Sequence, residues 1–281
     1  MTIRHEDAPT HRQLWAPPNR PRKFARLFRA AGISPRMRFV STESGTVHYE
    51  ETGDPAHAPV LFIHGSPGGW HHFVDYLADA ALLKVACLRA ADRPGYGRSQ
   101  PGLPEPRLSV QAQTMAACID DAPAVVVGHS YGGPVAIRLA ATHPEKVAGL
   151  ILISPVLDPG LEPGPWYDHV AGHPAVNRLL PRGWRSSVAE VRRLREELEE
   201  LQPLIQNVNC PVVLIHGERD RLVPYSTHIA FAHEHLEDIP VRTHHLIHAD
   251  HYLPWTHFER VHAVLLRMLE RTTVAVARPE G

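Results

Sequence analysis

Short apolar runs alternate with amphipathic stretches along the chain from about residue 38 onward. Runs rich in apolar and β-branched residues predict strands, which lie at 38–41, 46–51, 60–63, 84–89, 124–127, 150–154, 212–215 and 241–247. Helical spacing of apolar residues predicts helices at 70–83, 108–122, 134–142, 226–236 and 254–271. Buried strands that alternate with helices are typical of a parallel sheet with helices on both faces. The pattern therefore predicts an α/β fold over residues 38–281, with a mostly parallel, doubly wound, eight-stranded sheet.

The first 37 residues differ from the rest and are expected to form a basic N-terminal arm. In a short helical pattern, Phe24, Leu27 and Phe28 share one face, while arginines share the opposite face. Such a segment either packs its apolar face on its own domain or makes weak contact with an anionic membrane surface through residues 20–32. We favour packing on the domain, because two helical turns are short for membrane anchoring.

The alternation of strands and helices is interrupted at about residues 156–205. The first half of this segment is rich in proline and glycine and contains Trp166, Tyr167 and Trp184, whereas the second half has the apolar stripe of one charged helix. We expect a short lid of helix and loop, inserted after the sixth strand over the carboxyl edge of the sheet. The three aromatic residues are expected either to line an acyl pocket or to pack the lid itself.

Composition and charge exclude several classes of protein. A net charge of −1 gives no basis for nucleic acid as a partner. The three cysteines, Cys87, Cys118 and Cys210, lie in apolar runs and are expected to be reduced core residues. We find no stretch typical of a membrane span or a signal peptide, so we expect a cytoplasmic protein whose peripheral membrane contact, if any, is made by the arm.

Residues 128–132 read GHSYG and lie between a predicted strand and a predicted helix. A serine on a sharp strand-to-helix turn needs small residues two positions before and after it, and the turn exposes its hydroxyl above the sheet. The N–H groups that follow lie at the positive N-terminus of the helix. This context predicts that Ser130 is a nucleophile.

A serine nucleophile needs a base, and the base needs an orienting acid. Of the histidines that crowd the late part of the chain, His248 and His251 fall in the loop before the last helix. The acid is expected in a loop at the end of an earlier strand, where Asp220 follows 212–215 and Asp158 follows 150–154. No metal site is expected among these histidines, because they straddle a strand and a loop without a recognised ligand spacing.

A glycine-rich turn, HGSPGG at 64–69, follows the strand at 60–63. Glycine allows the main chain to approach a ligand closely. The backbone N–H groups of Ser66 and Tyr131 are therefore expected to form an oxyanion hole, in which each donor stabilises a tetrahedral intermediate.

Five segments, taken together and in this order, resemble the α/β-hydrolase superfamily. They are HGSPG (64–68), DRPGYGRS (92–99), GHSYGG (128–133), GERDRLVP (217–224) and DHYLPW (250–255). The resemblance implies that Asp220 and His251 complete a catalytic triad with Ser130, that Ser66 and Tyr131 supply the oxyanion N–H groups, and that a lid lies between about 156 and 205.

The resemblance implies a serine hydrolase that cleaves a carboxylic ester with a small or medium acyl group, without a metal or an organic cofactor. The H-G-x-P-G turn is similar to that of esterases, carbon–carbon hydrolases, epoxide hydrolases and dehalogenases, and Ser130 argues against the last two, which use aspartate. A carbon–carbon hydrolase, an aminopeptidase-type hydrolase and a non-catalytic ligand-binding relative are the alternatives. The partner is expected to be a small carbonyl compound.

Overall fold

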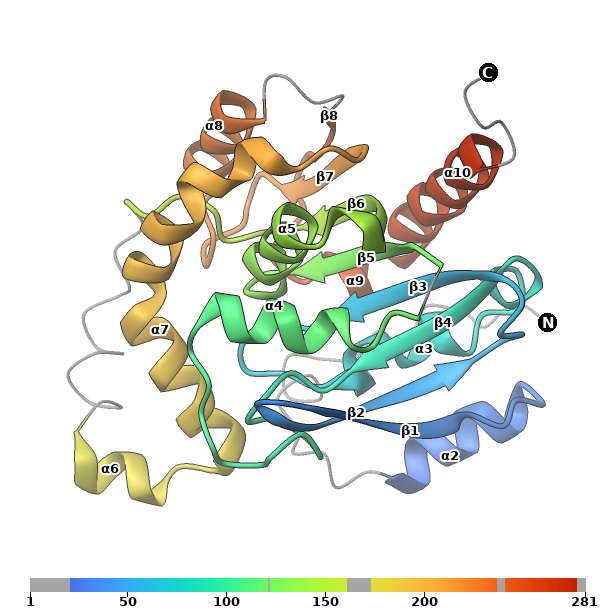
Figure 1. Cartoon of the computed structure of the whole chain (residues 1–281), viewed down its shortest axis with the longest axis horizontal. Helices are drawn as coiled ribbons and strands as arrows, with labels where there is room; N and C mark the ends of the chain where they lie inside the picture. Colours follow the sequence, from blue (N-terminus) through green and yellow to red (C-terminus); the bar gives the residue numbers. More distant parts are fainter. Residues whose placement is uncertain (1–20, 121, 161–172, 237–240, 277–281) are drawn as a thin grey trace.

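A computed structural model describes residues 21–120, 122–160, 173–236 and 241–276 of the chain (Figure 1). Its eight-stranded sheet confirms the predicted fold class, and the strand order is β1-β2-β4-β3-β5-β6-β7-β8. The strands are β1 (Arg36–Thr42), β2 (Gly45–Thr52), β3 (Ala58–Ile63), β4 (Ala86–Ala91), β5 (Ala124–His129), β6 (Val147–Ile153), β7 (Val212–Gly217) and β8 (Val241–Leu246). The β1–β2 hairpin is antiparallel and β2 pairs antiparallel with β4, whereas all other neighbours are parallel.

Helices cover both faces of this sheet. They are α2 (Pro21–Ala30), α3 (Val74–Leu77), α4 (Leu108–Ala116), α5 (Gly132–Thr142), α6 (Pro174–Leu179), α7 (Arg182–Leu201), α8 (Tyr225–His235), α9 (Leu253–Thr256) and α10 (Phe258–Val276). Short 3₁₀ helices lie at Trp70–Phe73, Leu82–Lys84, Pro144–Lys146 and Gln202–Asn207.

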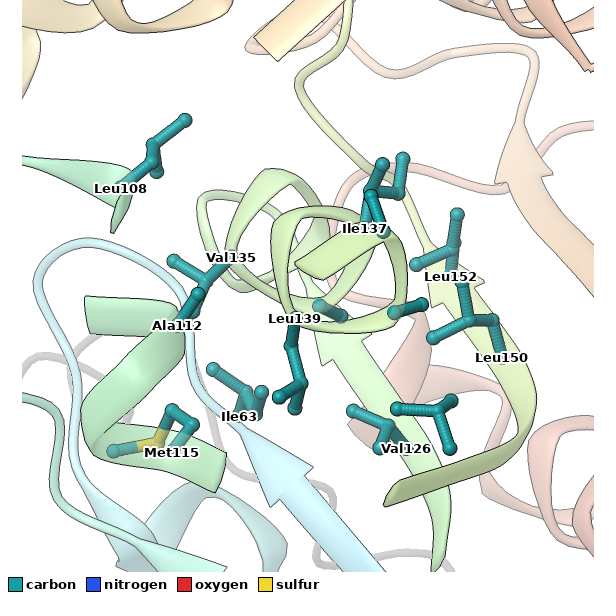
Figure 2. Close-up of a cluster of buried hydrophobic side chains, with 14 of the residues drawn as sticks. Ile63, Leu108, Ala112, Met115, Val126, Val135, Ile137, Leu139, Leu150 and Leu152 are labelled. Carbon is teal, nitrogen blue, oxygen red and sulfur yellow. The ribbon is translucent and has the colours of Figure 1, made fainter. Parts of the chain in front are cut away.

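Alternate residues of the central strands point to opposite faces of the sheet and build two cores. Leu61 and Val126 belong to the core that packs against α4, α5, α7 and α8, part of which is drawn in Figure 2. Val60 and Phe62 flank Leu61 on β3 and belong to the core on the other face of the sheet, against α2, α3 and α10. Burial on both faces explains why these strands read as continuous apolar runs in the sequence.

Two predicted helices are broken in the structure. The segment 70–83 forms a 3₁₀ turn and the short α3, and Asp79 then caps the next turn by accepting hydrogen bonds from the N–H groups of Ala81 and Leu82. The last helix is divided at His257, which leaves helical backbone angles (φ −128°, ψ 40°) between α9 and α10. Side-chain caps and single non-helical residues of this kind do not disturb the apolar periodicity on which the prediction rests.

The basic arm packs on its own domain over the part that the structure describes. Phe28 is buried, and the rings of Phe24 and Phe28 lie 5.4 Å and 6.4 Å from that of Trp70. Arg26 and Arg29 of α2 are exposed. This packing favours the domain interpretation of residues 20–32, and the membrane contact stays a prediction; residues 1–20 lie outside the described part.

The segment predicted as a lid begins after β6, and α6 and α7 are its described helices (Figure 1). The apolar side of α7 is buried through Val188, Leu194 and Leu198. Trp166 and Tyr167 lie outside the described residues, so their two predicted roles stay predictions. None of the helices in the described ranges is both long enough and apolar enough to cross a membrane.

Candidate active site

Ser130 lies on a strained turn between β5 and α5, at the centre of the sheet. Its φ is +54°, a value that non-glycine residues rarely adopt, and the residue is half-buried. The turn is too tight for side chains at its flanking glycines: a Cβ on Gly128 would lie 2.5 Å from the carbonyl oxygen of Gly132, and one on Gly132 would lie 2.2 Å from that of Ile63. The geometry is that of the turn that the spacing of the glycines predicts.

The structure brings Asp220 and His251 together at the carboxyl edge of the sheet. His251 Nδ1 lies 2.7 Å from Asp220 Oδ2, and both side chains are buried. The other carboxylate oxygen accepts hydrogen bonds from the N–H groups of Leu222 and Val223, at 2.9 Å and 2.8 Å. Burial opposes ionisation of Asp220, but the hydrogen bonds from His216, His251 and the backbone outweigh it and lower the pKa of the carboxyl. The carboxylate is therefore charged and held in one orientation.

The residue directly before Ser130 contacts the His251 loop. His129 Nε2 donates a hydrogen bond to the carbonyl oxygen of His251 at 3.1 Å, and the two rings lie 5.0 Å apart. Burial is the main cause that lowers the pKa of His129 to about 3, so this imidazole is neutral. In the described part of the chain, no hydrogen bond joins Ser130 to His251 directly, and His129 is the residue that connects the two loops.

Neither His248 nor Asp158 joins this group. His248 is exposed. The Asp158 carboxylate instead accepts a hydrogen bond from the N–H of Gly160 at 2.7 Å, within its own turn. The described histidines, cysteines and acidic residues form no group of three or more arranged to hold a metal ion.

The turn after β3 lies next to Ser130, because Ile63 pairs with Gly128 in the sheet. A Cβ on Gly65 would lie 3.0 Å from Ser130 Cβ, so a side chain there would crowd the nucleophile turn. Ser66 is in this turn and Tyr131 follows Ser130. Within the described ranges, neither of these two N–H groups donates a hydrogen bond to the protein. Both predicted oxyanion residues therefore adjoin the nucleophile turn with their N–H groups available.

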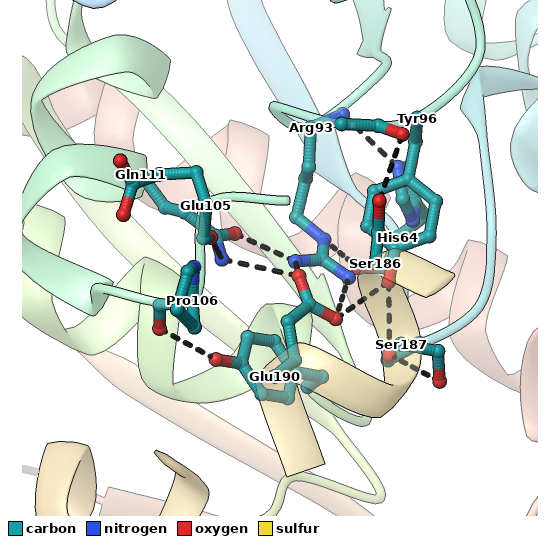
Figure 3. A network of polar contacts seen from close by, with 12 residues as sticks. His64, Arg93, Tyr96, Glu105, Pro106, Gln111, Ser186, Ser187 and Glu190 are labelled. Carbon is teal, nitrogen blue, oxygen red and sulfur yellow. Dashed lines mark hydrogen bonds and ion pairs between the residues drawn. The ribbon is translucent and has the colours of Figure 1, made fainter. Parts of the chain in front are cut away.

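A buried ion pair that the sequence did not reveal supports this turn (Figure 3). Arg93 follows β4 and Glu190 lies on α7, and both side chains are at most 1% exposed. The two guanidinium Nη atoms donate to the Glu190 carboxylate, Nη2 at 3.2 Å, and Nη1 also donates to Gln111 at 2.6 Å. Arg93 lies in the DRPGYGRS segment, which is one of the five segments that carry the family resemblance. Glu190 is one of many charged residues on α7, and nothing near it in the sequence distinguishes it.

The chain matches a family model described as alpha/beta hydrolase fold over residues 58–190. It is 37% identical over 117 residues to Lipase LipV of Mycobacterium tuberculosis, a match that covers 40% of this chain and 42% of the lipase. It is 23% identical over 271 residues to a 2-hydroxy-6-oxononadienedioate/2-hydroxy-6-oxononatrienedioate hydrolase of a Pseudomonas species, covering 81% of this chain and 93% of that protein. The chain thus spans less than half the length of the lipase, and nearly all of the second relative.

Solved structures show the same fold. A putative aryl esterase from Burkholderia cenocepacia superposes with a TM-score of 0.67 at 22% identity, and the match covers 86% of this chain and 100% of the esterase. A likeness at this level of identity supports the fold alone.

Proposed function

We propose that this chain, which belongs to the α/β-hydrolase superfamily, is a serine hydrolase that cleaves carboxylic esters. The observation that carries the proposal is the contact of 2.7 Å between His251 and Asp220, both buried, together with the hydrogen bond from His129 to the His251 carbonyl, which joins this pair to the residue before a half-buried serine on a strained turn. A buried carboxylate next to one imidazole nitrogen fixes the tautomer in which the other nitrogen accepts a proton.

In the proposed reaction, His251 Nε2 takes the proton of Ser130 Oγ as the oxygen attacks the carbonyl carbon of the ester. The carbonyl oxygen becomes an oxyanion and is stabilised by the N–H groups of Ser66 and Tyr131. His251 then protonates the leaving alcohol, and an acyl group remains on Ser130. Water attacks this acyl-enzyme with His251 as its base, which releases the acid and restores the serine.

Two features support an ester substrate and a short lid. The relatives include a protein named as a lipase and a structure named as a putative aryl esterase. The segment predicted as a lid, at about residues 156–205, adds only α6 and α7 as described helices, which suits a short lid. The lid itself remains part of the proposal.

A fluorophosphonate probe tests the proposal, because it bonds only to an activated serine. We expect the wild-type protein to be labelled on Ser130 and the Ser130→Ala variant to remain unlabelled. Absence of labelling of the folded wild-type protein, or labelling of the alanine variant, would overturn the assignment. Hydrolysis of p-nitrophenyl esters of increasing acyl length then measures the substrate range.

A carbon–carbon hydrolase with the same residues is the second candidate, and the near full-length match to the Pseudomonas hydrolase favours it. Such an enzyme would cleave a vinylogous diketone strongly and p-nitrophenyl esters weakly, whereas the proposed esterase would show the opposite preference. The ratio of the two kcat/KM values separates the candidates.

A further inference from the structure

Arg93 contacts the turn that carries Ser66 and also the ring of Tyr131, and these two residues are proposed to supply the oxyanion hole. Its Nε donates to the carbonyl oxygen of His64 at 2.8 Å, and its Nη2 donates to that of Gly65 at 2.9 Å. The guanidinium carbon also lies 4.8 Å from the ring centroid of Tyr131. One fully buried cation is therefore in contact with the turn that carries Ser66 and with the residue that follows the nucleophile.

The hydrogen bond to Gly65 bears directly on the N–H of Ser66. The Gly65 carbonyl and the Ser66 N–H belong to one trans peptide unit, in which the two groups point in opposite directions. The carbonyl oxygen accepts hydrogen bonds from Arg93 Nη2 and from His64 Nδ1, the latter at 2.7 Å, and the two donors together fix the direction of the N–H. Because the Arg93 donor is charged, it also polarises the peptide and strengthens the N–H as a hydrogen-bond donor.

Glu190 holds Arg93 in this position from α7. Its carboxylate pairs with the guanidinium and also accepts a hydrogen bond from the Tyr96 hydroxyl at 2.6 Å. The same turn of α7 also contacts the turn that carries Ser66 directly, since Ser66 Oγ donates to Ser187 Oγ at 2.9 Å. A buried arginine without its carboxylate partner would be strongly unfavourable, so the position of Arg93 depends on α7.

We propose that Arg93 is a positioning residue of the oxyanion hole and that Glu190 makes this positioning depend on the placement of α7. The proposal rests on the serine-hydrolase function proposed above. A movement of α7 that separates Glu190 from Arg93 would leave His64 Nδ1 as the remaining donor to the Gly65 carbonyl, and the looser Gly65–Ser66 peptide would weaken the oxyanion hole. A helix of the predicted lid would thereby affect the rate of the chemical step.

The chain offers a matched control in a second buried arginine–glutamate pair. Arg89, on β4, donates from Nε to Glu51 on β2 at 2.9 Å and from Nη1 to the carbonyl oxygen of Cys118 at 2.9 Å. These side chains are 5% and 4% exposed. Neither of them contacts the residues of the candidate site, so variants of this pair measure the cost of disturbing a buried ion pair alone.

The kinetic experiment compares Arg93→Lys and Glu190→Gln with Arg89→Lys and Glu51→Gln, using p-nitrophenyl acetate. For Arg93→Lys we expect kcat to fall by about 10- to 100-fold, with KM changed by less than about three-fold, because the lost interaction acts on the transition state. The affinity for a trifluoromethyl ketone, which forms a tetrahedral adduct on the serine, should fall in parallel. Glu190→Gln should show the same pattern with a smaller loss. The control variants should lower Tm and keep kcat within about two-fold.

An unchanged kcat in folded Arg93→Lys would overturn the proposal, and so would equal kcat losses in the control pair. A second measurement requires no turnover. In protein labelled with ¹⁵N-serine, loss of the hydrogen bond to the Gly65 carbonyl should move the Ser66 amide nitrogen upfield in Arg93→Lys and leave it in place in Arg89→Lys. An unmoved Ser66 resonance contradicts the positioning role even in a folded variant. Failure of the hydrolase function itself is recognised separately, as wild-type protein that fluorophosphonate does not label.

Discussion

Ser130 and Ser154 lie side by side at the carboxyl ends of neighbouring parallel strands, and their backbones are alike. Each directly follows a residue of the pair His129–Ile153 in the sheet register. Their φ values are +54° and +43°, and their N–H groups donate to Ile153 and Ile215, each on the next strand. A left-handed serine at a strand end is therefore not sufficient to identify a nucleophile.

The surroundings of the two serines differ in ways that bear on reactivity. Ser154 is fully buried, its hydroxyl has no hydrogen-bond partner within the described residues, and a proline follows it. Ser130 is half-buried and precedes α5. A reactive hydroxyl must be reached by substrate and must lie beside stabilising N–H groups. Only Ser130 meets both requirements, which is why the proposed function depends on it.

The comparison of Ser130 with Ser154 is tested most directly by removing each hydroxyl group in turn. Ser130→Ala should lower kcat for p-nitrophenyl acetate by about 10⁴-fold or more, since the nucleophile is lost. Ser154→Ala should keep kcat within about two-fold and leave the free energy of unfolding unchanged or higher, because a buried hydroxyl without a partner is unfavourable. Steady-state kinetics and urea denaturation measure these effects. A large loss of turnover in Ser154→Ala would show that the two serines are functionally equivalent.

The acidic residues that follow β6 and β7 provide the next test. Asp220→Asn should lower kcat by about 10³- to 10⁴-fold, because an amide can hold His251 in the wrong tautomer. Asp158→Asn should leave kcat within about three-fold, since this carboxylate caps its own turn and does not contact His251. The same kinetic assay applies to both variants. Equal losses would mean that Asp158 shares the role assigned to Asp220.

The smallest effect is on stability and involves His228, which contacts the segment after Ser154. His228 Nδ1 accepts hydrogen bonds from the N–H groups of Leu157 and Asp158 at 3.0 Å, and burial lowers the pKa of His228 to about 4. The unfolded chain binds a proton at this residue below about pH 6.5, whereas the folded protein stays neutral down to about pH 4. Stability from this group is therefore complete above pH 6.5 and is lost as the pH falls toward 4, at about 1.4 kcal/mol per pH unit.

The free energy of unfolding, measured by urea denaturation at pH 7.0, 6.0 and 5.0, checks this expectation. In His228→Gln, the free energy of unfolding should depend less steeply on pH, by the equivalent of about one bound proton. The kcat of this variant at pH 7 should equal that of the wild-type protein. A slope equal to that of the wild-type protein would mean that His228 is already protonated in the folded state. The neutral His129 beside Ser130 contributes to the remaining slope, because its pKa is also lowered, to about 3.

The features that the sequence predicted well are those with a local signal. The central strands are buried on both faces, so their apolar runs were visible, and the glycines around Ser130 are required by a turn of five residues. The helix expected at 70–83 failed because its interruption depends on a cap from Asp79 rather than on periodicity. The pairing of Arg93 with Glu190 joins residues 97 positions apart. Such a pair has no signature in a single sequence, because each member reads as an ordinary charge.

The order of the strands also has a consequence for how the protein is made. Ser130 follows β5, in the middle of the sheet, whereas the loop with His251 follows β8, the edge strand and the last to leave the ribosome. A growing chain can assemble the nucleophile turn and its flanking strands before it possesses a base. In the proposed mechanism, a nascent or truncated chain therefore carries an unactivated serine. Hydrolysis begins only after β8 and the loop that carries His251 have been synthesised and have folded.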